Sequence, residues 1–159
     1  MKARIQKMIS IKSVLFTAVM LFIVSALTLA AGHDPVSISG TVDLASFTGT
    51  ATVIIGSEEL ECEVAVIPMQ PPEPKDGGLY FPEVQHVFTF EDGSTLTTTG
   101  EEFAMPTDEN PAILTLHGNM EIISGTGVLE GASGELRVNG QMDWSIGQAT
   151  FNANGAISR

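Results

Sequence analysis

The sequence predicts an all-β protein: a single eight-stranded antiparallel β-barrel that follows an N-terminal signal peptide. Apolar and polar residues alternate with a period of two from residue 34 onward, which is typical of half-buried strands. Short turns separate these runs, as in a sandwich or a barrel. Several glycines fall on the apolar face, where they relieve crowding in a closed barrel, so we expect a barrel rather than a flat sandwich. These glycines are Gly40, Gly118, Gly140 and Gly155.

Residues 1–30 have the layout of a secretory signal peptide. The basic residues of this leader are Lys2, Arg4, Lys7 and Lys12. An uncharged apolar run follows at 14–29, and Thr28 and Ala30 occupy the −3 and −1 positions of a cleavage site. An uncleaved anchor is the alternative, because the run approaches the ~18 apolar residues that span a bilayer. We expect cleavage after Ala30, a barrel domain at 31–159 and a secreted or periplasmic location.

The domain after the leader is strongly acidic. It holds all nineteen acidic residues of the chain and only three basic ones, which gives a formal charge of −16. Such a surface repels phosphate backbones and anionic membranes, so we expect no nucleic-acid binding and no stable membrane insertion after cleavage. The charge favours cations or basic partners. Glu59, Glu61 and Glu63 on one strand face suggest calcium binding, and a solvated surface is the simpler interpretation.

The eight expected strands follow the chain in order. They cover residues 36–44, 48–55, 60–66, 84–90, 94–99, 112–123, 134–144 and 149–157. Asp92-Gly93 is typical of a two-residue hairpin turn. Two proline-rich stretches, Pro68–Pro82 and Phe103–Pro111, predict surface loops outside the sheet. The first either packs on the surface or covers a barrel mouth as a lid.

The sequence contains no motif for a metal, a cofactor or a serine nucleophile. It has no paired Cys/His spacing, no phosphate-binding or dinucleotide-binding glycine loop and no Gly-x-Ser-x-Gly elbow, so we predict no metal site and no cofactor. Cys62, the only cysteine, shares the parity of Leu60 and Val64. We therefore expect a buried thiol, and a catalytic cysteine is the less favoured alternative.

His86 is the first candidate for chemistry. It shares the parity of Val84 and Phe88, so we expect it to point inward, where it would act as an acid or base beside an inward carboxylate. A hydrogen-bonded core histidine is the alternative. Arg137 is the second candidate catalytic residue. The candidate ligand-binding residues are aromatic side chains expected on the inner face: Phe88, Phe90, Trp144 and Phe151.

The glycine-rich stretch Ile123–Val138 predicts a strand, a tight bend and a strand. Its part from Gly125 to Val138, GTGVLEGASGELRV, resembles the signature near the C-terminus of the allene oxide cyclases, and the dirigent proteins carry a looser version. The resemblance implies an eight-stranded barrel with a central cavity and, often, homo-oligomers. In the plant cyclases that cavity holds an unstable epoxide and steers ring closure mainly by shape. The acidic, exported context departs from a plastid enzyme and resembles a secreted bacterial branch of this superfamily.

Three functions follow as expectations. The first is a non-catalytic secreted or periplasmic barrel that binds a small apolar ligand or has a surface role. The second is a cyclase or isomerase that confines a reactive apolar substrate. The third is an acidic cation-binding surface protein. An open apolar lumen that contains His86, Arg137 or a carboxylate favours catalysis, whereas a lumen filled by side chains would contradict both the ligand-binding and the cyclase hypotheses.

Overall fold

The computed structural model describes residues 32–159. The predicted signal peptide and its cleavage site lie outside the described residues. None of residues 32–159 belongs to a helix long and apolar enough to cross a membrane.

Nine strands and one 3₁₀ turn account for most of the described chain. They are β1 (Asp34–Asp43), β2 (Thr48–Ile55), β3 (Glu58–Pro68), β4 (Glu73–Lys75), β5 (Gly78–Phe90), β6 (Thr95–Pro106), β7 (Ile113–Gly125), η1 (Gly127–Leu129), β8 (Ser133–Asp143) and β9 (Gln148–Ser158).

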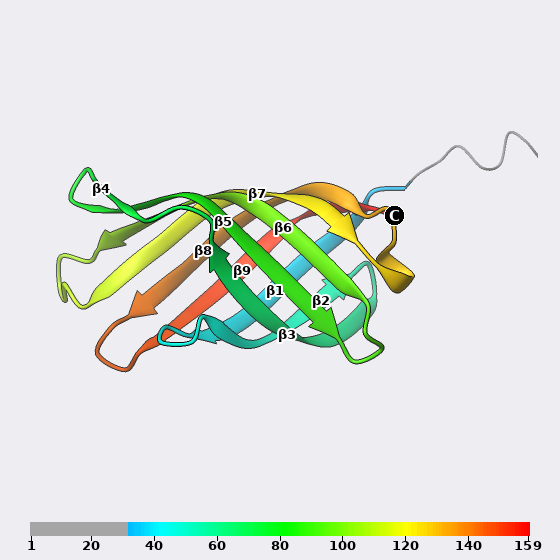
Figure 1. The fold of residues 1–159 in the computed structure, drawn as a ribbon, viewed down its shortest axis with the longest axis horizontal. Coiled ribbons are helices and arrows are strands. Elements are labelled where there is room, and N and C mark those ends of the chain that lie inside the picture. Colours follow the sequence, from blue (N-terminus) through cyan, green and yellow to red (C-terminus); the bar gives the residue numbers. More distant parts are fainter. Residues whose placement is uncertain (1–31) are drawn as a thin grey trace, which may run out of the picture. The chain divides into compact units, whose positions relative to one another are not determined.

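Eight of these strands close into an antiparallel barrel, as the sequence predicts (Figure 1). From β1 to β3 and from β5 to β9, strands next to each other along the chain pair with each other, and β1 pairs with β9. The pairing of β3 with β5, from Cys62 opposite Phe90 to Pro68 opposite Val84, completes the circle. The short strand β4 pairs only with the start of β5 and extends the sheet beyond the closed part.

Alternating side chains fill the interior of the barrel. Each long strand buries every second residue, such as Val36, Ile38 and Val42 on β1. The four inward glycines are needed because an added Cβ at each would overlap a carbonyl oxygen of a neighbouring strand. The strands therefore approach one another more closely there than side chains allow, which confirms the crowding expected from the sequence.

The two ends of the barrel are built differently. The far end carries both ends of the described chain, the β2–β3 and β5–β6 turns and the segment that contains η1, at the right of Figure 1. Here Leu129 of η1 is completely buried. Gly127 makes this turn with a φ of 62°, which favours glycine. The opposite end, which we call the mouth, carries the β1–β2, β3–β4, β6–β7 and β8–β9 connections.

Four local predictions were wrong in detail. The segment Pro68–Pro82 is not wholly outside the sheet, because it contains β4 and the start of β5; its Pro82 lies at a register shift between Phe81 and Val84. The predicted loop at Phe103 is strand, since β6 continues to Pro106. The turn after β5 spans four residues, 91–94. The glycine-rich bend contains the 3₁₀ turn η1 between its two strands.

Candidate functional site

An apolar pocket opens at the mouth of the barrel. Its apolar lining residues are Val42, Leu44, Phe47, Val66, Pro68, Phe81, Val84, Leu116, Met142, Ala149 and Phe151. The two other lining residues are ionisable, His86 and Glu102. The pocket has a volume of about 40 Å³. Each water molecule needs roughly 10–15 Å³ of such space, so the pocket has room for a few waters or a small chemical group.

The small volume of the pocket shows that most of the barrel interior is filled by side chains. Pockets that enclose a whole drug-sized ligand typically measure about 300–1,000 Å³. The described barrel instead has a core packed with apolar side chains and a small chamber near one end. Any larger ligand must therefore keep most of its body outside the chamber, against the rim of the mouth.

His86 and Glu102 form a buried pair in this pocket. His86 projects inward from β5 and Glu102 from β6, and each residue is 5% exposed. The His86 Nε2 atom lies 3.6 Å from Glu102 Oε1, which is too long for a hydrogen bond. The other ring nitrogen, Nδ1, and Glu102 Oε1 are closed off from solvent and have no hydrogen-bond partner. The expected inward orientation of His86 is thus confirmed, and the carboxylate beside it is that of Glu102.

Burial shifts the protonation of both groups toward neutrality. Desolvation lowers the pKa of His86 from 6.5 to about 4, because the charged imidazolium loses its hydration. The same effect raises the pKa of Glu102 from 4.5 to about 7. In slightly acidic solution the pair therefore consists of a neutral imidazole and a protonated carboxyl group. These groups offer both hydrogen-bond donors and acceptors without a net charge.

Aromatic rings hold the imidazole in place. Phe88 stacks near it with a centroid distance of 6.2 Å and an interplanar angle of 15°, and Phe151 lies at 6.1 Å and 47°. Phe151 also lines the pocket, whereas Phe88 lies deeper in the core. Thr98, opposite His86 on β6, directs its hydroxyl to the sulfur of Met120 at 3.4 Å. The surroundings thus supply packing to His86 but no hydrogen bond among the described residues.

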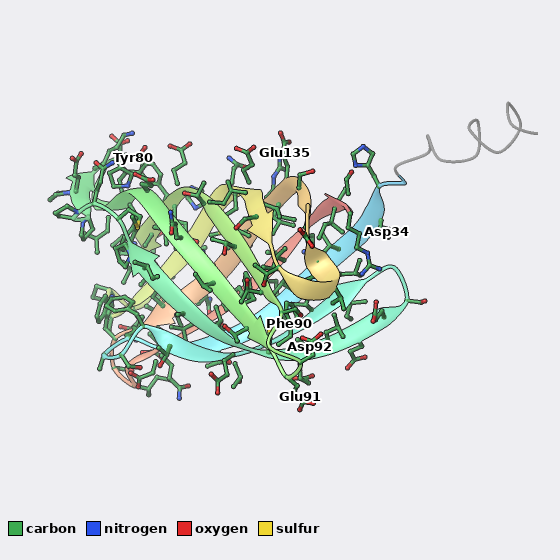
Figure 2. The ribbon with its side chains drawn as sticks, turned by 45° about the vertical axis from the view of Figure 1, so that its right-hand side comes forward. Asp34, Tyr80, Phe90, Glu91, Asp92 and Glu135 are labelled. Carbon is green, nitrogen blue, oxygen red and sulfur yellow. The ribbon has the colours of Figure 1, made fainter. Side chains whose placement is uncertain are left out.

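Three other residues predicted for the site lie elsewhere. Phe90 is buried near the β5–β6 turn at the far end, as its place beside Glu91 and Asp92 in Figure 2 shows. Arg137 is on β8 but faces outward. Trp144 is 48% exposed because β8 ends at Asp143, whose carboxylate accepts hydrogen bonds from the backbone and hydroxyl of Ser145 and starts the turn. The inward orientation expected for Trp144 was therefore wrong, and Arg137 does not reach the pocket.

Sequence reasoning missed Glu102. The predicted strand ended at Thr99, so the residue fell outside the alternating pattern. The signal was present: Leu96, Thr98, Gly100, Glu102 and Ala104 share one parity, and all except the glycine are buried. A carboxylate in such a run is a candidate for an inward ionisable group.

The remaining predicted groups stay outside the pocket. Cys62 is buried as expected and donates to the Ala51 carbonyl at 3.3 Å, and burial raises the pKa of its thiol to about 11. Glu59, Glu61 and Glu63 are exposed on β3. Within residues 32–159, no three His, Cys, Asp or Glu side chains come together in a way that could hold a metal ion.

Comparison with protein-family models, with curated proteins and with solved structures finds no match to this chain. The resemblance to the allene oxide cyclases therefore stays a prediction, which rests on the segment Gly125–Val138.

Proposed function

We propose that this protein is an exported, non-catalytic binding barrel whose ligand has an apolar body and one uncharged polar head. One observation carries the proposal: an ionisable pair without hydrogen-bond partners at the base of an otherwise apolar pocket. Leaving a buried polar atom unpaired costs about 1–3 kcal/mol, so the pair weakens the fold when the pocket holds no partner. A ligand head that bonds to both groups would recover that free energy.

The shape of the pocket divides the ligand into two parts. The chamber of about 40 Å³ fits a hydroxyl or amide head beside His86 and Glu102. The apolar body would then lie against the rim, where Leu44, Phe47 and Val66 line the pocket. Burial of this body supplies roughly 25 cal/mol for each Å² of apolar surface removed from water.

The negative charge of the domain favours a ligand whose polar head is uncharged. The domain has a formal charge of −16, and a protonated Glu102 loses its neutrality above about pH 7. A carboxylate head would face this negative field and a weakly basic imidazole that cannot pair with it as a cation. We therefore expect alcohols and amides to bind more tightly than carboxylates of the same length.

Calorimetric titration at pH 6 tests this function with three probes of similar apolar size: octan-1-ol, octanoate and dibutyl ether. We expect octan-1-ol to bind about tenfold more tightly than dibutyl ether, which lacks a donor; a tenfold ratio equals about 1.4 kcal/mol. Replacing both polar residues, in His86→Leu/Glu102→Leu, should abolish this preference. Ala149→Leu, which fills the chamber, should weaken octan-1-ol binding, whereas the exposed Ser39→Ala is a control. Equal affinity for alcohol and ether in the wild-type protein would contradict the proposal.

The protonation of the pair favours one second candidate, an isomerase that moves a proton on an apolar substrate. A neutral imidazole and a protonated carboxyl 3.6 Å apart are a base and an acid ready for use near neutral pH. In such a reaction His86 would accept a proton from the carbon next to a carbonyl while Glu102 protonates the carbonyl oxygen. Exchange of solvent deuterium into octan-2-one, lost in both His86→Gln and Glu102→Gln, would establish this candidate over simple binding.

A further inference from the structure

A second hollow lies on the outside of the barrel, away from the mouth pocket. It has a volume of about 780 Å³ and crosses the outer face of β6, β7, β8 and β9. Gly155 is one of its lining residues. The polar side chains that line it are Thr99, Asn119, Glu121, Glu135, Arg137 and Asn154. The outer surface thus offers amides, carboxylates and one guanidinium group along a single groove.

A row of aromatic rings on the outer face meets this groove at one end. Tyr80, Phe103 and His117 lie opposite one another on β5, β6 and β7. The Tyr80 and Phe103 centroids are 4.8 Å apart, and Phe103 and His117 stack at 5.8 Å with an angle of 13°. His117 and Asn119 face the same side of β7, two residues apart, so the His117 end of the row adjoins the polar part of the groove. Figure 2 shows Tyr80 and Glu135 on the same side of the barrel.

We propose that this outer face binds a neutral carbohydrate chain. Amides and carboxylates form paired hydrogen bonds with adjacent hydroxyl groups, and flat aromatic rings accept the apolar C–H face of a sugar. The hollow is open along the surface, so a chain of sugar units can lie along it without entering a deep cavity.

The charge distribution distinguishes a neutral chain from a polyanion. Two carboxylates line the groove and a third, Glu101, accepts a hydrogen bond from the Tyr80 hydroxyl at 2.7 Å. Arg137 is the single cationic residue in the lining. Sulfated or uronic-acid polymers would meet like charges there, whereas uncharged hydroxyls would not.

A lysine side chain covers one end of the row of aromatic rings. The Lys75 ammonium, on β4, lies 4.2 Å from the Tyr80 ring centroid and 5.0 Å from that of Phe103. His117, at the other end of the row, is exposed. A sugar would therefore stack at the His117 end, next to Asn119, and the test variant targets that end.

Affinity electrophoresis tests the inference with four neutral polysaccharides: laminarin, xyloglucan, galactomannan and dextran. Heparin and alginate serve as polyanions. We expect at least one neutral polymer to retard the wild-type protein and neither polyanion to do so. The triple variant His117→Ala/Asn119→Ala/Asn154→Ala should raise the dissociation constant obtained from that retardation about tenfold or more, equivalent to about 1.4 kcal/mol.

A matched variant controls for the number of substitutions. Ser39→Ala/Glu59→Ala/Glu63→Ala changes three exposed residues on β1 and β3, and we expect it to bind as the wild type does. Retention of binding in the first triple variant, or no retardation by any neutral polymer, overturns the inference. Because octan-1-ol binding depends on His86 and Glu102, the two proposals can fail independently.

Discussion

The side chains that fill the two ends of the barrel differ in kind. At the far end, Leu129 of η1 is fully buried among apolar neighbours and closes the core. At the mouth, the equivalent space holds His86 and Glu102, which are buried yet lack hydrogen-bond partners. The same eight strands support both arrangements, so the fold does not require an ionisable pair to close an end. The difference is the reason for placing the proposed binding site at the mouth.

The largest expected effect comes from removing the apolar closure of the far end. Leu129→Ala should lower the free energy of unfolding by about 3 kcal/mol, since it leaves a cavity where the side chain is fully buried. Leu44→Ala at the mouth should cost less, because Leu44 already borders the pocket and solvent can enter the space. Urea unfolding followed by circular dichroism measures both. Equal losses at the two ends would show that the mouth is as tightly packed as the far end.

The next effect in size is the pH dependence of the free energy of unfolding, which depends on His86 and Glu102. In Glu102→Gln, the lone His86 makes the folded state weaker as the pH falls from 6.5 to about 4, because only the unfolded chain takes up the proton there. In His86→Gln, the lone Glu102 weakens the folded state as the pH rises from 4.5 to about 7, because the unfolded chain releases its proton first. Each change should reach roughly 3 kcal/mol over its window.

In the wild-type protein these two slopes oppose each other between pH 4.5 and 6.5, so stability should change little there. Urea midpoints measured at half-unit pH intervals check all three proteins. Two single variants with parallel profiles would mean that burial does not control the protonation of the pair.

A smaller effect of opposite sign is expected when the whole pair is replaced. His86→Leu/Glu102→Leu should raise the free energy of unfolding by about 1–2 kcal/mol, because apolar side chains of similar volume remove two desolvated polar groups. The same variant should lose its preference for octan-1-ol over dibutyl ether. A stability below that of the wild type would mean that the pair supports the fold, and the contrast between the two ends would disappear.

The smallest effect concerns Arg137. Because this side chain faces outward on β8, Arg137→Ala should change the free energy of unfolding by no more than about 0.5 kcal/mol and leave octan-1-ol binding unchanged. Calorimetry on the variant measures the binding. A clear loss of octan-1-ol affinity would connect the outer face to the mouth.

The sequence predicts most of the barrel strands, but of the two ionisable pocket residues it predicts only His86. Strict alternation from Val36 onward predicts the strands, and inward glycines such as Gly118 predict the tight closure, because both depend on local sterics. His86 was placed correctly for the same reason. Glu102 was missed because prolines close to it suggested a loop, whereas the closed sheet keeps β6 paired as far as Pro106.

Long-range geometry explains the other errors. Nothing local shows that β8 ends at Asp143 and leaves Trp144 in the turn, since the alternation continues through the tryptophan. The register shift near Pro82 likewise lets Phe81 and Val84 both point inward, although their parities differ. The outer row of Tyr80, Phe103 and His117 depends on strand register, which a single sequence does not display.

Nitrogen-15 spectra of the imidazole rings during an octan-1-ol titration test the central claim most directly. The chain has three histidines: His86 in the pocket, His117 on the outer face and His33 near the start of the described chain. We predict that the ring nitrogens of His86 shift as the alcohol saturates its site, while those of His33 and His117 stay unchanged. Saturable binding with an unmoved His86 would contradict the account.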